Sequence, residues 1–237
     1  MKALELKEVS YSYDGKHAII DQISFGVDCG EVVSLMGLNG AGKTTLLELI
    51  ATLKKPAKGQ CLYFDDETIP IPQIRSQIGY VAQEVALYDH FSIEENLHLF
   101  GKLYHLQKEA LEEQIQKLLK WLKLEGQGNV KIKHCSGGMK RKAHLAAALL
   151  HQPKLLILDE PTAGIDAPTA MQIIESLRGL SKEGVAILCV AHSFEEVLAL
   201  GGRVIWLKNG RKHQEVNLDD VSINGKEQIK TMFADCI

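Results

Sequence analysis

The stretch GLNGAGKTT, residues 37–45, lies between the mainly apolar runs EVVSLM at 31–36 and LLELIATL at 46–53. Its first eight residues match G-x-x-x-x-G-K-[ST], a pattern in which glycines allow backbone N–H groups to surround phosphate oxygens. The pattern needs a buried strand before the loop and a helix after it, because the helix N-terminus also faces the bound charge. The two flanking runs supply both, so this stretch predicts a phosphate-binding loop in an α/β protein.

The loop also supplies side chains for a nucleoside triphosphate. We expect the Lys43 ammonium to reach the β- and γ-phosphates and the Thr44 hydroxyl to bind Mg²⁺. The predicted phosphate-binding residues are Gly37, Asn39, Gly40, Ala41, Gly42, Lys43, Thr44 and Thr45.

The composition is that of an ordinary globular protein. The chain has 237 residues, of which 46% are hydrophobic and 24% charged, enough for one large or two small domains. A formal net charge of −3 provides no overall basic field, so we expect no nucleic-acid partner. The five cysteines are scattered without a Cys-x-x-Cys pair, which argues against a disulfide framework or a zinc site.

The sequence gives no indication of a membrane span. Its longest apolar runs, such as VAILCVA at 185–191, fall far short of the ~18 residues that a spanning helix needs. The first ten residues lack the apolar core of a signal peptide. We therefore expect a cytoplasmic protein that does not itself cross the membrane.

The order of predicted elements indicates one α/β unit with a helical insertion. Short strands dominate residues 3–35, and residues 151–216 alternate strands and helices as in a parallel sheet. Capping boxes are predicted at Ser92 with Glu95 and at Ser193 with Glu196. We predict one domain, 1–237, with a core and β subdomain at 1–90 and 151–216, a helical subdomain at 91–150 and a tail at 217–237.

Two carboxylates, Asp159 and Glu160, end the buried strand in LLILDEP, residues 155–161. Ligands of parallel sheets bind at the carboxyl ends of strands, so both side chains are candidates for nucleotide chemistry. We expect Asp159 to hold Mg²⁺ through water and Glu160 to polarise the attacking water. An alternative for Glu160 is that it caps the next helix.

Three further residues are candidates from their positions in the predicted strands. Gln83 and His192 each follow a strand, so both could converge on the γ-phosphate and its water. Tyr13 could stack on an adenine ring, although a half-buried strand aromatic is the simpler interpretation. Tyr11, two residues earlier in a strand, would point the same way and remains an alternative.

A second candidate anion site lies in CSGGMKRK, residues 135–142. Ser136 is a natural N-cap, and Gly137 and Gly138 expose N–H groups at the positive end of a helix. The helical insertion separates this site from the loop at 37–45, so the two sites cannot easily hold one phosphate. This arrangement suggests that the second site holds a nucleotide bound by another copy.

The stretches GLNGAGKTT, YVAQ, SGG, LLILDEPTAGID and VAH, in this order, resemble the nucleotide-binding subunit of an ATP-binding cassette (ABC) transporter over about residues 3–215. The resemblance implies a P-loop NTPase fold that binds ATP and Mg²⁺. By this resemblance, the residues are Gly37–Thr45 in the Walker A loop, Gln83 as Q-loop glutamine and Mg²⁺ ligand, Ser136–Gly138 in the signature loop, Asp159 in Walker B, Glu160 as catalytic base, Asp166 as D-loop aspartate, His192 as switch histidine and Tyr13 as adenine-stacking aromatic.

The family also implies partners. Two cassettes pair head to tail with ATP between the Walker A loop of one and the signature loop of the other, so we expect a second ABC ATPase subunit, most simply in a homodimer. The versions SGGMKR and FSIEENLHLFGKLY resemble cassettes of exporters whose membrane permease is a separate chain. The resemblance thus implies export by a complex in which this chain lies on the inner face of the membrane, docked through EVALYDHF at 84–91.

Two features depart from the family pattern or stay open. Cys135 and Met139 replace the usual leucine and glutamine at the ends of the signature. The basic cluster, Lys131, Lys133, Lys140, Arg141 and Lys142, is interpreted as a solvated helix face that meets lipid headgroups or nothing.

Rival functions lack their own signatures. A soluble ABC-type ATPase acting on a non-transport target usually fuses two cassettes or inserts a long coiled coil, and neither is visible. A guanine-nucleotide switch needs an Asn/Thr-Lys-x-Asp motif, and a kinase needs an acceptor site, which are likewise not found.

Overall fold

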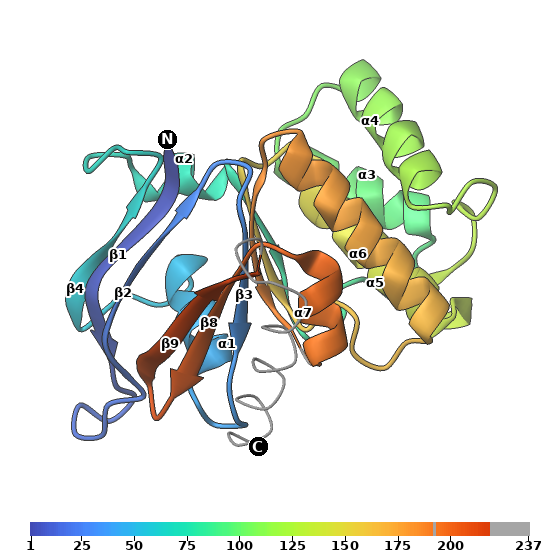
Figure 1. The fold of residues 1–237 in the computed structure, drawn as a ribbon. Coiled ribbons are helices and arrows are strands. Elements are labelled where there is room, and N and C mark those ends of the chain that lie inside the picture. Colours follow the sequence, from blue (N-terminus) through green and yellow to red (C-terminus); the bar gives the residue numbers. More distant parts are fainter. Residues whose placement is uncertain (192, 219–237) are drawn as a thin grey trace.

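The computed structural model describes residues 1–191 and 193–218 and contains two sheets with helices around them (Figure 1). The smaller sheet is antiparallel, in the order β2-β1-β4. Its strands are β1 (Lys2–Tyr11), β2 (Ile20–Asp28) and β4 (Lys58–Tyr63).

The larger sheet has the order β5-β6-β7-β3-β8-β9, in which the first five strands are parallel and β9 is antiparallel to β8. These strands are β5 (Ile78–Val81), β6 (Leu155–Asp159), β7 (Ala186–Val190), β3 (Val32–Met36), β8 (Arg203–Lys208) and β9 (Arg211–Asn217). Every residue of β3, β6 and β7 is buried, as expected for parallel strands that are covered on both faces. The predicted parallel sheet is confirmed, and a turn at Asn209 and Gly210 leads from β8 into β9.

The period of two along the buried strands divides the interior into two cores. In β6, Leu155 and Ile157 join a core with the smaller sheet and the helix α1 (Lys43–Ile50). Leu156 and Leu158 face the opposite core, which the other large helices cover. The helix that begins at the glycine loop is therefore held between the two sheets, as Figure 1 shows.

The other helices are α2 (Ile71–Arg75), α3 (Ile93–Leu103), α4 (Lys108–Trp121), α5 (Gly137–Leu149), α6 (Ala167–Lys182) and α7 (Phe194–Leu200), with a 3₁₀ turn at Ile132–His134. Helix α5 packs against α3 and α4 on one side and against β5 and α6 on the other, so it connects the helical region to the core sheet. None of the helices in the described ranges has both the length and the apolar character that crossing a membrane requires.

The predicted capping box is observed at the start of α3, and at the start of α7 Ser193 is the predicted N-cap. Ser92 and Glu95 form both hydrogen bonds of a capping box. At α7, Ser193 Oγ accepts from the backbone N–H of Glu196 at 3.2 Å. The Glu196 carboxylate also accepts from the Thr162 hydroxyl at 2.6 Å, which joins α7 to the segment after β6. His192 and the tail beyond Leu218 lie outside the described residues.

Candidate nucleotide site

The strands β3, β5, β6 and β7 end at the same edge of the larger sheet. The register pairs Val81 with Leu158, and it pairs Val190 with both Asp159 and Leu35. The glycine loop and the segments after β5 and β6 therefore leave the sheet side by side. This is the edge at which ligands of parallel sheets bind.

A hollow of about 330 Å³ lies at this edge. Most of its walls come from the glycine loop and the first turn of α1, and the rest from the ends of β5, β6 and the turn before β2. The lining residues are Ile19, Asn39, Gly40, Gly42, Lys43, Thr44, Thr45, Gln83 and Glu160. The fold thus brings together candidates that the sequence places in three separate motifs.

The glycine loop is shaped by two close approaches of its backbone. Gly42, which precedes α1, has φ of 96°, and a Cβ there would lie 2.8 Å from Cδ1 of Ile20. At Gly37, with φ of 152°, a Cβ would lie 2.3 Å from the carbonyl oxygen of Leu207. Side chains at these positions would push the loop away from β2 and β8, so glycine is required at both.

The Lys43 side chain bonds to the backbone of the glycine loop. Its Nζ donates to the carbonyl oxygens of Gly37 at 2.8 Å and of Leu38 at 3.1 Å. Burial lowers the pKa of Lys43, and the nearby carboxylates of Glu160 and Asp159 oppose that shift. The ammonium is therefore held between the loop and the two acids, where an anion in the loop would meet it.

Asp159 and Thr44 fit a hard cation. Asp159 is 2% exposed, and its Oδ2 is buried without a hydrogen-bond partner. Burial raises the pKa of Asp159, while a hydrogen bond with Thr44 opposes the shift. A carboxylate oxygen and a hydroxyl are the ligand types that Mg²⁺ takes. Gln83 lines the same hollow and could add an amide oxygen, and phosphate oxygens and water would complete the ligands of such an ion.

Glu160 faces the hollow from the end of β6. Its Oε2 accepts a hydrogen bond of 2.8 Å from Nε2 of Gln83, so the two predicted residues are in direct contact. The alternative in which Glu160 caps the next helix is wrong, because Asp166 is the N-cap of α6 and accepts from the Thr169 N–H at 3.0 Å.

Tyr13 lies beside the hollow, beyond the end of β1. It is 62% exposed, and its hydroxyl lies 3.1 Å from Oγ1 of Thr45 in α1. Lys54 Nζ is 5.5 Å from the centre of the same ring. Tyr11 instead packs against the core. The interpretation of Tyr13 as a half-buried strand aromatic is therefore wrong, and Tyr13 rather than Tyr11 offers an open face.

The second candidate anion site, Ser136–Gly138, lies apart from this hollow. Ser136 caps α5, since its Oγ accepts from the Met139 N–H at 3.2 Å, and both Ser136 and Gly137 are exposed. A Cβ on Gly137 would lie 3.6 Å from the carbonyl oxygen of Gly164. The structure therefore places the signature residues beside the loop that leads to Asp166, with neither segment lining the nucleotide hollow.

The basic cluster divides in space. Arg141 is partly buried and donates to the carbonyl oxygens of Gln83 and Ala163, beside the nucleotide hollow. Lys142 is only 8% exposed and donates to Oε1 of Gln172 at 2.8 Å. The interpretation as a solvated face is wrong for these two residues, because each reaches inward to a segment distant in the sequence.

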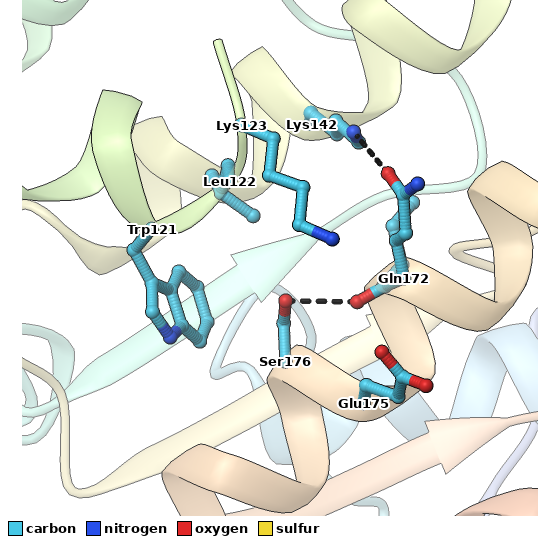
Figure 2. A pocket seen from close by; sticks show the side chains of 8 residues that line it. Trp121, Leu122, Lys123, Lys142, Gln172, Glu175 and Ser176 are labelled. Atoms are coloured by element: carbon cyan, nitrogen blue, oxygen red, sulfur yellow. Dashed lines mark hydrogen bonds between the residues drawn. The ribbon is translucent and has the colours of Figure 1, made fainter. Parts of the chain in front are cut away.

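Lys142 belongs to a different hollow, of about 190 Å³, between α4, α5 and α6. Figure 2 shows the Lys123 ammonium pointing over it and Trp121 forming a wall.

The sequence does not indicate Arg141 as a residue of the nucleotide site. The available signal was its spacing, since it lies four residues after Gly137 and thus on the same face of α5.

Comparisons with known proteins agree with this geometry. A family model described as ABC transporter matches residues 20–163. The chain is 38% identical over 213 residues to Nod factor export ATP-binding protein I of Neorhizobium galegae, covering 88% of this chain and 60% of that protein. It is 34% identical over 212 residues to spermidine/putrescine import ATP-binding protein PotA of Mycoplasma capricolum subsp. capricolum, covering 89% of this chain and 60% of that protein.

A solved structure shares the fold along nearly its whole length. The dimeric post-hydrolysis state of the ATP-binding cassette MJ0796, bound to ADP and Pi, has a TM-score of 0.80 and 28% sequence identity, covering 91% of this chain and 98% of that chain. The chain spans about three fifths of the length of the two curated relatives. The P-loop NTPase fold is confirmed, and the family match covers more than half of the chain. This chain belongs to the ABC transporter family.

Proposed function

We propose that this chain is the ATP-binding and ATP-hydrolysing subunit of an ABC transporter and drives transport through a separate membrane permease. The observation that carries the proposal is the single hollow in which the glycine loop, Thr44, Gln83 and Glu160 meet, next to the unpartnered oxygen of Asp159.

The roles follow from these contacts. Loop N–H groups and Lys43 would bind the phosphates, and Thr44, Asp159 and Gln83 would hold Mg²⁺. When bound, Mg²⁺ would neutralise charge on the β- and γ-phosphates. Glu160 accepts a hydrogen bond from the attacking water and orients it, and the amide of Gln83 fixes the direction of that carboxylate. His192, which lies outside the described residues, is proposed from the family resemblance to contact the γ-phosphate.

Two copies are proposed to close head to tail around two ATP molecules. The support is the separation of Ser136–Gly138 from the nucleotide hollow, together with the position of Asp166 beside them. Hydrolysis is expected to open the pair. The MJ0796 cassette with which this chain shares its fold is described as dimeric.

Glu160→Gln provides the test of this arrangement, because it keeps the shape of the site and removes the base. The variant should be a monomer alone and a dimer with Mg²⁺-ATP, as measured by size-exclusion chromatography with light scattering. Wild-type chain in Mg²⁺-ATP is the control, since its turnover should return it to monomer. A Glu160→Gln chain that binds ATP but stays monomeric would contradict pairing of identical copies.

The permease is proposed to dock on the segment after Gln83. Tyr88 is 56% and Phe91 41% exposed, with ring centres 5.5 Å apart. Buried Asn96 bonds both backbone groups of Tyr88, at 2.8 and 3.1 Å, and holds the loop in place. Leu87, by contrast, packs against the core, so the exposed apolar patch is smaller than the sequence indicated. Replacement of Tyr88 and Phe91 by Glu should release the chain from membranes that contain its permease, whereas unchanged association would contradict this docking site.

Export is proposed as the direction of transport. The support is the SGGMKR form of the signature and the similarity to a Nod factor export protein, although a spermidine/putrescine import protein is similarly related. In inside-out vesicles that carry the whole complex, export predicts ATP-driven accumulation of cargo in the lumen. ATP-driven loss of cargo from the lumen would indicate import.

A further inference from the structure

We infer that Arg141 is a positioning residue that couples the signature helix α5 to the catalytic carboxylate of the same chain. The inference rests on the roles proposed above for Gln83 and Glu160. Three links carry it: the two carbonyl groups that Arg141 holds, the hydrogen bonds from those two residues to Glu160, and the donor geometry of the arginine side chain.

The first link is the pair of carbonyl groups that Arg141 holds. One nitrogen of its guanidinium donates to the carbonyl oxygen of Gln83, and the other donates to that of Ala163 at 3.4 Å. These two carbonyls belong to the segments that follow β5 and β6, respectively. One side chain of α5 therefore fixes both segments at the edge of the sheet.

The second link runs from those segments to Glu160. The side chain of Gln83 donates to Oε2 of Glu160 at 2.8 Å, and the backbone N–H of Ala163 donates to the carbonyl oxygen of Glu160 at 3.1 Å. Both residues that Arg141 holds thus hold Glu160 in turn. One contact orients the carboxylate and the other shapes the turn that carries it.

The third link is the chemistry of arginine. A planar guanidinium presents several N–H donors in a fixed fork, so it can bond two carbonyls that a lysine could not span. Within the described residues, Arg141 has no carboxylate within 4.0 Å. Burial lowers the pKa of Arg141, and the fields of Glu160 and Asp159 oppose that shift. A charge kept partly buried without an ion pair is costly, which is consistent with a role in the site.

The position of Arg141 in α5 would connect Glu160 to the signature residues at the start of that helix. Ser136–Gly138, at the start of this helix, are proposed to bind the ATP of a second copy, and Arg141 lies one turn further on. A shift of α5 caused by that contact would reach Glu160 of the same chain through Arg141. Each cassette would then set its own catalytic carboxylate according to the nucleotide on its partner.

A double-mutant cycle on the full chain tests this inference. Arg141→Ala should lower kcat for ATP about ten- to a hundredfold, because small displacements of a catalytic group have effects of this size, with a much smaller change in KM. In a Gln83→Ala background the link through the Gln83 side chain is already cut and only the link through Ala163 remains, so Arg141→Ala should lower kcat by a clearly smaller factor than it does in wild type. Arg141→Lys keeps the charge without the fork and should recover only part of kcat. Losses that multiply in both backgrounds, or an unchanged kcat, would overturn the inference.

Arg178→Ala is the matched control. Arg178 is exposed and donates to one backbone carbonyl, that of Ala199, at 3.3 Å, but it does not line the nucleotide hollow. Its removal should leave kcat unchanged. Thermal unfolding of all variants distinguishes a loss of positioning from a loss of fold.

Hydrogen exchange gives a second readout that needs no turnover. Arg141→Ala should speed amide exchange in residues 83–88 and 162–164, and Arg178→Ala should not. Unchanged exchange in both segments would overturn the inference even in a chain without measurable ATPase activity. If Glu160→Gln left turnover intact, the proposed catalytic role would fail, while the exchange experiment would still judge the contacts of Arg141.

Discussion

Nε2 of Gln83 lies 2.8 Å from Oε2 of Glu160, although 77 residues separate the two in the chain. Gln83 follows β5 and Glu160 follows β6, and these strands are neighbours in the larger sheet. The contact gives the carboxylate a defined direction at the mouth of the nucleotide hollow. It also makes the two residues a unit whose members should not be interpreted separately.

Glu160→Gln should abolish most turnover while ATP binding persists. The amide keeps the size of the side chain but cannot act as a base, and a positioned base typically contributes ~10² to 10⁴ in rate. Steady-state ATPase assays and the Kd for ATP, measured together, check both statements. Exposed Glu175 on α6 supplies the control, since Glu175→Gln should change neither quantity. Equal turnover in wild-type and Glu160→Gln chains would reduce Glu160 to a structural acid.

Tyr13 should contribute to ATP affinity through its ring rather than through its hydroxyl. Tyr13→Ala removes the exposed face and should weaken ATP binding by about three- to tenfold, the range expected for one aromatic stacking contact. Tyr13→Phe removes only the contact with Thr45 and should stay within about twofold of wild type. Titration with a fluorescent ATP analogue measures both. Equal losses for Tyr13→Phe and Tyr13→Ala would assign the contribution to the hydroxyl.

Alanine substitutions at two adjacent glycines should have different effects: Gly138→Ala should destabilise the fold, and Gly137→Ala should weaken pairing with a second copy. A Cβ on Gly138 would lie 2.7 Å from Cγ2 of Thr169, whose hydroxyl is bonded to Asp166, so Gly138→Ala should lower the free energy of unfolding by about 1–3 kcal/mol. A Cβ on Gly137 would lie 3.6 Å from its nearest neighbour. The free energy of unfolding of Gly137→Ala should therefore stay within about 0.5 kcal/mol of the wild-type value.

Gly137→Ala should nevertheless weaken ATP-dependent pairing, because its new methyl group lies at the exposed start of α5 where a partner's phosphate is proposed to bind. Urea unfolding and light scattering in the Glu160→Gln background provide the two readouts. Normal pairing of the Gly137→Ala variant would argue against contact between this loop and the partner's ATP.

The free energy of unfolding should decrease as the pH is lowered, over a pH range that is set by His144. Burial lowers the pKa of His144 to about 4, with the charge of Arg141 acting in the same direction, and its Nδ1 has no hydrogen-bond partner in the described residues. Between pH ~6.5 and ~4 the unfolded chain binds a proton at this residue and the folded chain does not. Acid therefore favours unfolding through His144 by on the order of 2–3 kcal/mol across this window.

His144→Gln should accordingly lose less unfolding free energy than wild type between pH 7 and pH 4.5 in urea titrations. Parallel slopes for wild type and His144→Gln would show that His144 is protonated equally in both states.

Local patterns in the sequence are sufficient to predict the strand, loop and helix around Lys43 and the cap of α3. In both cases the relevant partners are within a few residues of each other, so spacing alone determines the structure. The convergence of Gln83 and Glu160 on one edge was also predictable, because parallel strands end together.

Contacts between distant segments were not predictable in the same way. The sequence shows that Arg141 and Lys142 are charged and on one helix, but not that carbonyls from residues 83 and 163 and the amide of Gln172 lie opposite them. Similarly, spacing indicated Glu196 as a capping partner, while its contact with the Thr162 hydroxyl depends on how α7 packs. In each case the choice among polar partners is made by tertiary packing.

Glu160 has a φ of 49°, a left-handed backbone conformation that glycine adopts far more readily than glutamate. Holding a non-glycine residue there costs on the order of 1–3 kcal/mol. A change to glycine would therefore relieve the backbone strain at this position but remove the proposed catalytic base. A β-branched residue would neither relieve the strain nor supply the carboxylate. Such a position should evolve slowly for two independent reasons, and a glycine found there in a related chain would mark a cassette that has kept its fold and given up its turnover.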